Sequence, residues 1–297
     1  MAIANKKHAE QPNPDRHTPF SLVLAGGGAR GLSHAGVLFA LDHYGYKPSS
    51  IVGVSMGAIV GTTYALNPNW YSDLVNLDVR GFPNVPKAYS GNLRSRIRDL
   101  IASELILQEM LFGWGVGSRS SAWGKKLLQK LTLGRDLEEA DIAIAVVATD
   151  LRSGKRVVIE HGNAGDAAYA SAALAGIVPP FAYGDFLLAD GCYTDLFPID
   201  VARRSGAEIV IAVDPSQSVE PDILSNGLET MLRAMEICQR EHALLRLHEA
   251  DFVIRPEFRQ TINTLEFQHK RACIASGIRS AKAAVPMLGE LLRRDAA

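Results

Sequence analysis

Two glycine-containing turns near the start of the chain carry the residue types best suited to chemistry. Residues 53–57 read Gly-Val-Ser-Met-Gly and directly follow an apolar segment that is typical of a strand. A Gly-x-Ser-x-Gly turn after a strand is typical of a nucleophile elbow, in which glycines relieve the crowding of a sharp strand-to-helix turn and expose the serine hydroxyl. The pattern predicts Ser55 as a nucleophile, with Gly53 and Gly57 supporting the turn.

The second turn, residues 26–31, reads Gly-Gly-Gly-Ala-Arg-Gly after the apolar segment 20–25. A glycine loop that opens a helix leaves backbone N–H groups without partners, and such donors stabilise a developing oxyanion. One turn therefore offers a nucleophile, and the other offers a way to stabilise the charge that its attack creates. Together the two turns indicate a serine acyl hydrolase.

The same glycine loop also fits two kinds of nucleotide site. Gly26, Gly28 and Gly31 satisfy the G-x-G-x-x-G dinucleotide fingerprint, which requires an acidic residue at the end of the next strand to hold a ribose. The next strand ends instead in Ser55, and the nearby Asp42 falls inside the intervening helix. No Gly-Lys-Ser/Thr follows the loop, as a P-loop would require. Both nucleotide interpretations are therefore disfavoured.

Length and composition fit an ordinary globular protein. The chain has 297 residues, of which 47% are hydrophobic, and a net charge of −1, so no global field recruits nucleic acid. Three widely spaced cysteines predict free thiols in a reducing, cytoplasmic compartment. Their spacing does not indicate a metal site, and no cofactor is expected. Residues 1–18 lack the apolar core of a signal peptide and are expected to be a disordered leader. The longest apolar stretch, 51–66, is too short to cross a membrane.

Alternating strand and helix patterns predict one doubly wound α/β domain over 19–297, with a helical or loop cap inserted at about 70–135. Between Lys87 and Lys130, eight basic residues face three acidic ones. Such a segment suits a cap at a lipid interface, and it suits equally a solvated helical face packed on the core. Expected strands lie at 20–25, 50–54, 141–148, 155–160, 186–189, 207–213 and 251–254, and expected helices at 32–44, 56–66, 164–175, 199–205, 228–248 and 275–294.

A serine hydroxyl needs a base, and the residues alone leave its identity open. Three aspartates directly follow expected strands, at the sheet edge where open α/β sheets bind ligands: Asp150, Asp190 and Asp214. A Ser-His-Asp triad is the alternative, and the histidines available to complete it are His242, His248 and His269. The first two of these fall within a long amphipathic helix, away from any strand-to-loop junction. His34, in a first helical turn, is expected to be a buried structural histidine.

Four motifs in this order resemble the patatin-like phospholipase family: the glycine loop, the elbow, the Ser171-Ala172-Ala173 stretch with Pro179-Pro180-Phe181, and Asp190-Gly191. The similarity runs from about residue 21 to about residue 213. It implies a three-layer α/β/α sandwich around a mostly parallel central sheet. This chain departs from the family pattern after the Asp-Gly pair, where Cys192 stands in place of glycine or alanine.

The resemblance also implies roles for individual residues. Ser55 is the nucleophile and Asp190 the general base of a dyad without histidine. The oxyanion hole is formed by backbone N–H groups of Gly27, Gly28 and Ala29, and Arg30 braces the loop, with the support of Gly26, Gly31 and Gly191. The implied substrate is a phospholipid, lysophospholipid or neutral ester, reached by peripheral membrane contact. A regulatory or partner-binding protein on the same scaffold, with little turnover, is the alternative from another class.

Overall fold

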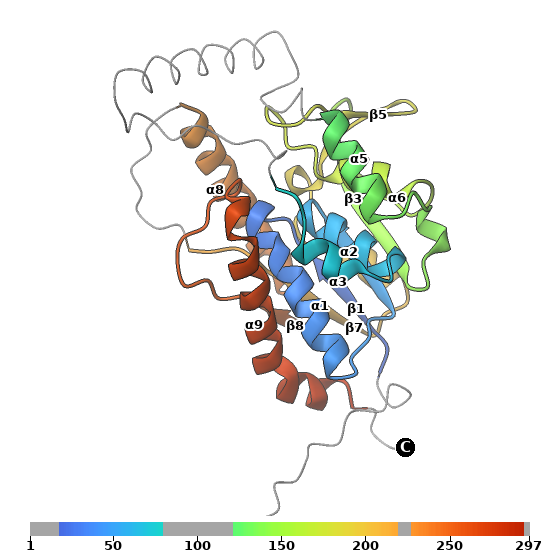
Figure 1. Ribbon diagram of the computed structural model, residues 1–297, viewed down its shortest axis with the longest axis vertical. Helices are drawn as coiled ribbons and strands as arrows, with labels where there is room; N and C mark the ends of the chain where they lie inside the picture. The colour runs from blue at the N-terminus through green and yellow to red at the C-terminus, as the bar shows by residue number, and fades with distance from the viewer. Residues whose placement is uncertain (1–17, 80–120, 219–226, 294–297) are drawn as a thin grey trace, which may run out of the picture.

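The computed structural model describes residues 18–79, 121–218 and 227–293. Its eight strands form one mixed sheet in the order β5-β6-β3-β2-β1-β7-β8, with β4 also paired to β3 (Figure 1). Four of the seven pairings between these strands are parallel. The strands are β1 (Phe20–Leu24), β2 (Ser50–Val54), β3 (Ala143–Asp150), β4 (Lys155–Ile159), β5 (Phe181–Tyr183), β6 (Phe186–Asp190), β7 (Ile209–Val213) and β8 (Phe252–Ile254).

The centre of the sheet is parallel and buried on both faces. β1 lies between β2 and β7, with Leu22 in register with Ile51 on one side and Ile211 on the other. Every residue of β1 and β2 is buried, and apart from one serine in each strand no residue of either is polar, as expected for parallel strands covered on both faces. Because parallel strands end at the same edge, the residues that follow β1, β2 and β7 meet there.

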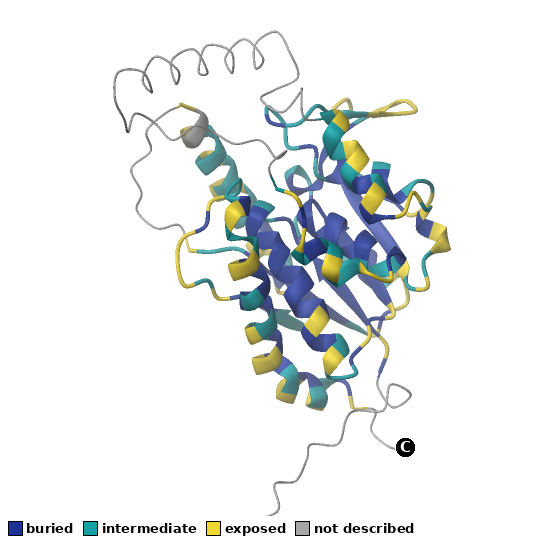
Figure 2. Cartoon of the chain, viewed as in Figure 1, coloured by how far each residue is buried: buried dark blue, intermediate teal, exposed yellow. Residues whose placement is uncertain are grey.

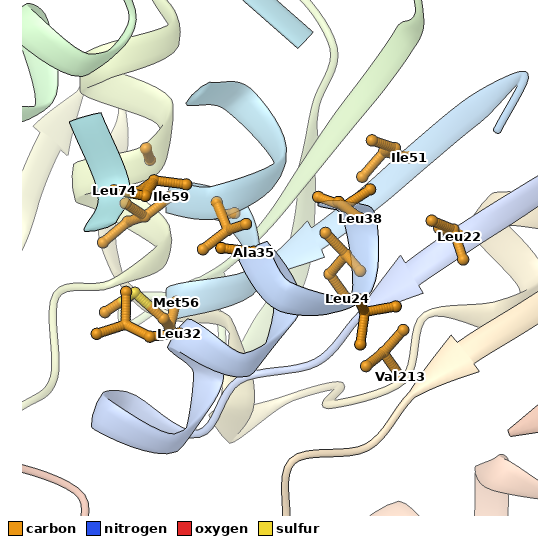
Figure 3. Packing of buried hydrophobic residues seen from close by; sticks show 14 of the residues in the cluster. Leu22, Leu24, Leu32, Ala35, Leu38, Ile51, Met56, Ile59, Leu74 and Val213 are labelled. Carbon is orange, nitrogen blue, oxygen red and sulfur yellow. The ribbon is translucent and has the colours of Figure 1, made fainter. Parts of the chain in front are cut away.

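Helices cover both faces of the sheet. Leu22 and Leu24 of β1 pack with residues of α1, α2, α6 and α9, whereas Val23, pointing the other way, packs with α7 and α8. Figure 3 shows the first of these cores, and Figure 2 shows the buried layers with exposed residues on the outside. The helices are α1 (Ser33–His43), α2 (Met56–Leu66), α3 (Trp70–Val75), α5 (Ser121–Leu131), α6 (Ala164–Ser171), α7 (Ile199–Arg204), α8 (Gly227–Leu247) and α9 (Lys270–Leu291).

Two glycines let α1 and α9 cross closely. A Cβ at Gly36 would lie 1.9 Å from the carbonyl oxygen of Ile274, and one at Gly277 would lie 1.9 Å from that of Ser33. No side chain fits at either position without moving the helices apart. This close crossing packs α1, which follows the glycine loop, tightly against α9 (Figure 1).

The predicted three-layer α/β/α fold is confirmed, with local differences. The strand 186–189 pairs antiparallel with both β3 and β5, so that side of the sheet is not parallel. The helix expected over 164–175 ends at Ser171, because the segment beyond it bonds to the site: the Ala173 carbonyl accepts from Asp190 N–H, and Ala175 N–H donates to the Tyr193 hydroxyl. The closing helix begins at Lys270, five residues before the expected start.

Two predicted segments fall largely outside the described residues. The leader at 1–18 is described only at Thr18, and the cap at 70–135 is described only for 70–79 and 121–135, which hold α3 and α5. Within the described ranges no helix is both long enough and apolar enough to cross a bilayer. The same ranges contain no group of three or more histidine, cysteine or acidic side chains placed to hold a metal ion.

Candidate active site

Ser55 occupies a strained turn between β2 and α2. Its φ of 54° lies in the left-handed region, which a residue with a side chain adopts at a cost of about 1–3 kcal/mol. A Cβ at Gly57 would lie 2.0 Å from the carbonyl oxygen of Leu24, so only glycine lets α2 begin so close to β1. The main chain is pinned by a bond from Ser55 N–H to the Ser171 hydroxyl at 2.8 Å. These features are those of a nucleophile elbow.

The structure brings Asp190 to Ser55. Asp190 ends β6, and its Oδ2 accepts a hydrogen bond from the Ser55 hydroxyl at 2.7 Å. Its Oδ1 accepts from the N–H of Cys192 at 2.9 Å, which fixes the plane of the carboxylate. Both partners are buried, with Ser55 8% and Asp190 3% exposed. The serine proton therefore has one well-oriented acceptor.

The other two aspartates have different partners. Asp150 accepts from the hydroxyl and N–H of Ser153 and from the N–H of Leu187, which lowers its pKa to about 2 and ties the turn after β3 to β6. Asp214 accepts from the N–H of Ser216 and from Arg255. Both carboxylates therefore organise loops at the edge of the sheet, and of the three only Asp190 bonds to Ser55.

The glycine loop lies on the wall of the cavity that contains Ser55. Among the described residues, no acceptor takes the N–H of Gly27 or of Gly28, and both residues line that cavity. Gly28 has a φ of 53°, and a Cβ there would lie 2.2 Å from the carbonyl oxygen of Thr264. The same carbonyl accepts the N–H of Ala29 at 2.8 Å. The N–H of Ala29, the third donor that the resemblance implies, thus already has an acceptor, whereas those of Gly27 and Gly28 are the stronger candidate donors.

Two buried side chains hold the glycine loop. Arg30, 6% exposed, donates from Nη1 to the carbonyl of Ile262 at 3.0 Å and from Nη2 to Glu236 of α8. His34 bonds through Nε2 to the carbonyl of Ala25 at 2.7 Å, and burial lowers its pKa to about 4. His34 is thus a buried structural histidine, as the sequence predicts, and it is neutral at pH 7. The remaining motif glycines, Gly26, Gly31, Gly53 and Gly191, are each packed so closely that a Cβ would meet a neighbour within 3 Å.

The cavity around Ser55 is mostly apolar. It has a volume of about 140 Å³, and both Ser55 and Asp190 line it. Its apolar lining comes from α2, the segment after α6, α8 and the segment before α9: Ile59, Leu174, Ile177, Val178, Leu232, Met235, Leu265 and Phe267. No histidine lines it among the described residues. His242 and His248 are exposed on or just after α8, and His269 bonds to Gln260, so none of the three histidines considered for a triad bonds to Ser55.

Burial sets the electrostatics of the site. Removal from water raises the pKa of Asp190, although the Ser55 hydroxyl and the Cys192 N–H partly oppose this by donating to the carboxylate. The same burial, with the nearby Asp190, raises the pKa of Cys192 well above its ordinary value, so this thiol is neutral. A carboxylate with a raised pKa is a stronger base than a free aspartate.

Ser171 is the residue that sequence reasoning missed. It lies at the end of α6, where its hydroxyl accepts from Ser55 N–H and donates to the Val147 carbonyl at 2.6 Å. The motif that contains it was visible in the sequence, but its role was not, because a serine in an alanine-rich helix has no pattern of its own. Only the packing of α6 against β3 reveals it.

Comparison with known proteins agrees with these motifs. A model of the family described as patatin-like phospholipase matches residues 22–203. The chain is 29% identical over 231 residues to patatin-like phospholipase domain-containing protein 7 of Mus musculus, covering 73% of this chain and 16% of that protein. It is 31% identical over 193 residues to lysophospholipase NTE1 of Debaryomyces hansenii, covering 65% of this chain and 11% of that protein.

A solved structure shares the fold. VipD from Legionella pneumophila aligns with a TM-score of 0.53 over 92% of this chain and 67% of that chain, at 14% identity. At this identity the likeness concerns the fold. The chain spans only about a sixth or less of the length of the mouse and yeast relatives.

Proposed function

The chain belongs to the patatin-like phospholipase family, and from this premise we propose that it is a lipid acyl hydrolase that cleaves carboxylic esters through a Ser55-Asp190 dyad. The observation that carries the proposal is the 2.7 Å bond from the Ser55 hydroxyl to Asp190 Oδ2. Both residues line a mostly apolar cavity, and such a lining suits an acyl chain.

The first half of the reaction forms an acyl-enzyme. The Ser55 oxygen attacks the ester carbonyl carbon while its proton passes to Asp190. The carbonyl oxygen becomes an oxyanion, which the N–H groups of Gly27 and Gly28 stabilise, and one such donor is worth about 10²–10³ in turnover. When the intermediate collapses, the bond from carbon to the leaving oxygen breaks and the alcohol takes the proton from Asp190.

The second half releases the fatty acid. A water molecule attacks the carbonyl carbon of the acyl group bound to the Ser55 oxygen and gives a proton to Asp190. The second oxyanion collapses, the bond to the serine oxygen breaks, and that oxygen recovers the proton. Asp190 acts as base and acid in turn, and its raised pKa makes the carboxylate a stronger base in the two steps in which it accepts a proton.

We further propose peripheral contact with a lipid surface and a cytoplasmic location. A phospholipid, lysophospholipid or neutral ester is held in a membrane or micelle, so the enzyme must reach that interface to bind it. The three cysteines are all free thiols, which fits a reducing compartment.

The test is turnover of p-nitrophenyl esters and phospholipids by three variants. Ser55→Ala and Asp190→Asn are expected to abolish hydrolysis while circular dichroism shows a folded chain. Asp150→Asn is the matched control, since it changes a buried aspartate at the same edge of the sheet that does not contact Ser55. This control should retain turnover.

A histidine variant decides between the dyad and the triad. His242→Ala should hydrolyse esters like the wild type. Loss of turnover in His242→Ala together with full turnover in Asp190→Asn would refute the dyad. Failure of the wild type to hydrolyse any of the esters would instead favour a regulatory protein.

A further inference from the structure

A second cavity lies beside the one that contains Ser55. Its volume is about 60 Å³, and it extends between the glycine loop and the C-terminal half of α8. The two cavities share a boundary, because five residues line both of them: Gly27, Arg30, Cys192, Glu236 and Gln239. The first three come from loops at the sheet edge, and the last two come from α8.

The boundary formed by these five residues, called the wall below, contains an ion pair between Arg30 and Glu236. Arg30 Nη2 donates to Glu236, so a charged pair links the glycine loop to α8 between the two cavities. Arg30 is also bound to the Ile262 carbonyl, so it is not free to rotate away. Gln239 lies three residues after Glu236 and therefore on the same side of α8, and it too lines both cavities. Both residues of α8 therefore lie at the boundary between the two cavities.

Several polar groups of the second cavity are bonded to other groups of the protein. Asp214 is bonded to Arg255 and Ser216 N–H. The Gln217 side chain is bonded at both ends, to the Gln260 carbonyl and to Ile262 N–H, and its own carbonyl accepts from Arg240. The apolar part of the lining is formed by Leu196, Phe197, Ala243, Leu244 and Leu247. Such a cavity suits hydrocarbon better than a polar head group.

We propose that Glu236 and Gln239 limit the length of the acyl chain. The inference rests on the proposed function and deepens it: the acyl chain occupies the Ser55 cavity, and the wall keeps its end out of the second cavity. The wild type therefore acts best on short and medium acyl chains. Removing the wall joins the two cavities and admits a longer chain.

The experiment compares chain lengths in variants of α8. Glu236→Ala and Gln239→Ala each open the wall, and Gln239→Ala leaves the Arg30 pair intact if Glu236→Ala does not fold. Glu236→Gln keeps the volume and an acceptor for Arg30. Glu241→Ala is the control, since Glu241 is exposed on the same helix and lines neither cavity. Two readouts are used: kcat/KM for p-nitrophenyl esters of 8 and 16 carbons, and the rate of Ser55 labelling by alkyl fluorophosphonates of the same lengths.

The ratio of long-chain to short-chain rates should rise about tenfold in both alanine variants, which is about 1.4 kcal/mol, within the range that pocket size controls. The ratio should stay at the wild-type value in Glu236→Gln and Glu241→Ala. An unchanged ratio in the folded alanine variants, or an equal rise in Glu236→Gln, would overturn the inference. Absence of both labelling and hydrolysis in the wild type would refute the proposed function instead.

Discussion

The hydroxyl of Ser171 supports the main chain at Ser55, the proposed nucleophile. It accepts the Ser55 N–H at 2.8 Å and donates to the Val147 carbonyl at 2.6 Å, and Ser171 is fully buried. Ser171→Ala removes both bonds at once. The main-chain groups left behind cannot reach bulk water, so each loses its partner without replacement.

The expected cost follows from these two groups. A buried donor or acceptor left unsatisfied costs about 1–3 kcal/mol, so Ser171→Ala should lower the free energy of unfolding by about 2–6 kcal/mol. Turnover should fall as well, because the left-handed conformation of Ser55 persists only where its surroundings hold it. If misalignment of Ser55 raises the activation free energy by about 1.4 kcal/mol, kcat falls about tenfold.

The assay needs a control that loses stability away from the site. Ser21→Ala serves, since Ser21 is also fully buried and exchanges bonds with Ser50 at the start of β1 and β2, the far end of the strands from the site. Urea unfolding and kcat for a p-nitrophenyl ester are measured for both variants. Ser21→Ala should lose stability and keep kcat, whereas Ser171→Ala should lose both.

Two results would refute the reasoning. A stability loss below about 0.5 kcal/mol in Ser171→Ala would mean that the bonds to Ser55 and Val147 contribute little. A kcat equal to that of the wild type would mean that the elbow holds its conformation without Ser171.

Two further predictions concern a charge and a close contact. Burial raises the pKa of Asp190, so the folded chain binds this proton more tightly than the unfolded chain, and stability falls as pH rises from below 3.8 through the raised value. Asp190→Asn should therefore raise the urea midpoint at pH 7 and leave it unchanged near pH 3, while kcat falls about 10²–10⁴-fold; equal midpoints at pH 7 would contradict the burial effect. Gly36→Ala should lower the free energy of unfolding by about 1–3 kcal/mol, since its Cβ would lie 1.9 Å from the carbonyl oxygen of Ile274. In Gly124→Ala the new Cβ would lie 4.0 Å from the nearest atom, Cε2 of Tyr169, so this variant should stabilise its helix by up to about 1 kcal/mol. Equal losses of stability in the two alanine variants would argue against the clash at Gly36.

Local patterns in the sequence predicted what local forces determine. The strands that precede the glycine loop and the elbow are apolar except for one serine in each, and the turn at Ser55 is specified by the glycines beside it. The layer order also followed from the alternation of strands and helices, because buried parallel strands need helices on both faces. These features depend on neighbours within a few residues along the chain.

Features that depend on distant pairings were harder to predict. Asp190 lies 135 residues after Ser55 and reaches it because β6 pairs antiparallel with β3. The residues alone therefore did not distinguish Asp190 from Asp150 and Asp214. The Ala29 N–H is taken by the Thr264 carbonyl, which no pattern near the glycine loop indicates. The bridge from Arg30 to Glu236 spans 206 residues and depends on how α8 packs on the sheet.

The most direct measurement is the rate at which a fluorophosphonate labels Ser55 in the wild type and in Asp190→Asn, followed by intact-protein mass spectrometry. If Asp190 accepts the serine proton, the wild type gains one adduct at Ser55, and Asp190→Asn gains it at least about 100 times more slowly. Equal rates in the two proteins, or an adduct at any residue other than Ser55, would contradict the account.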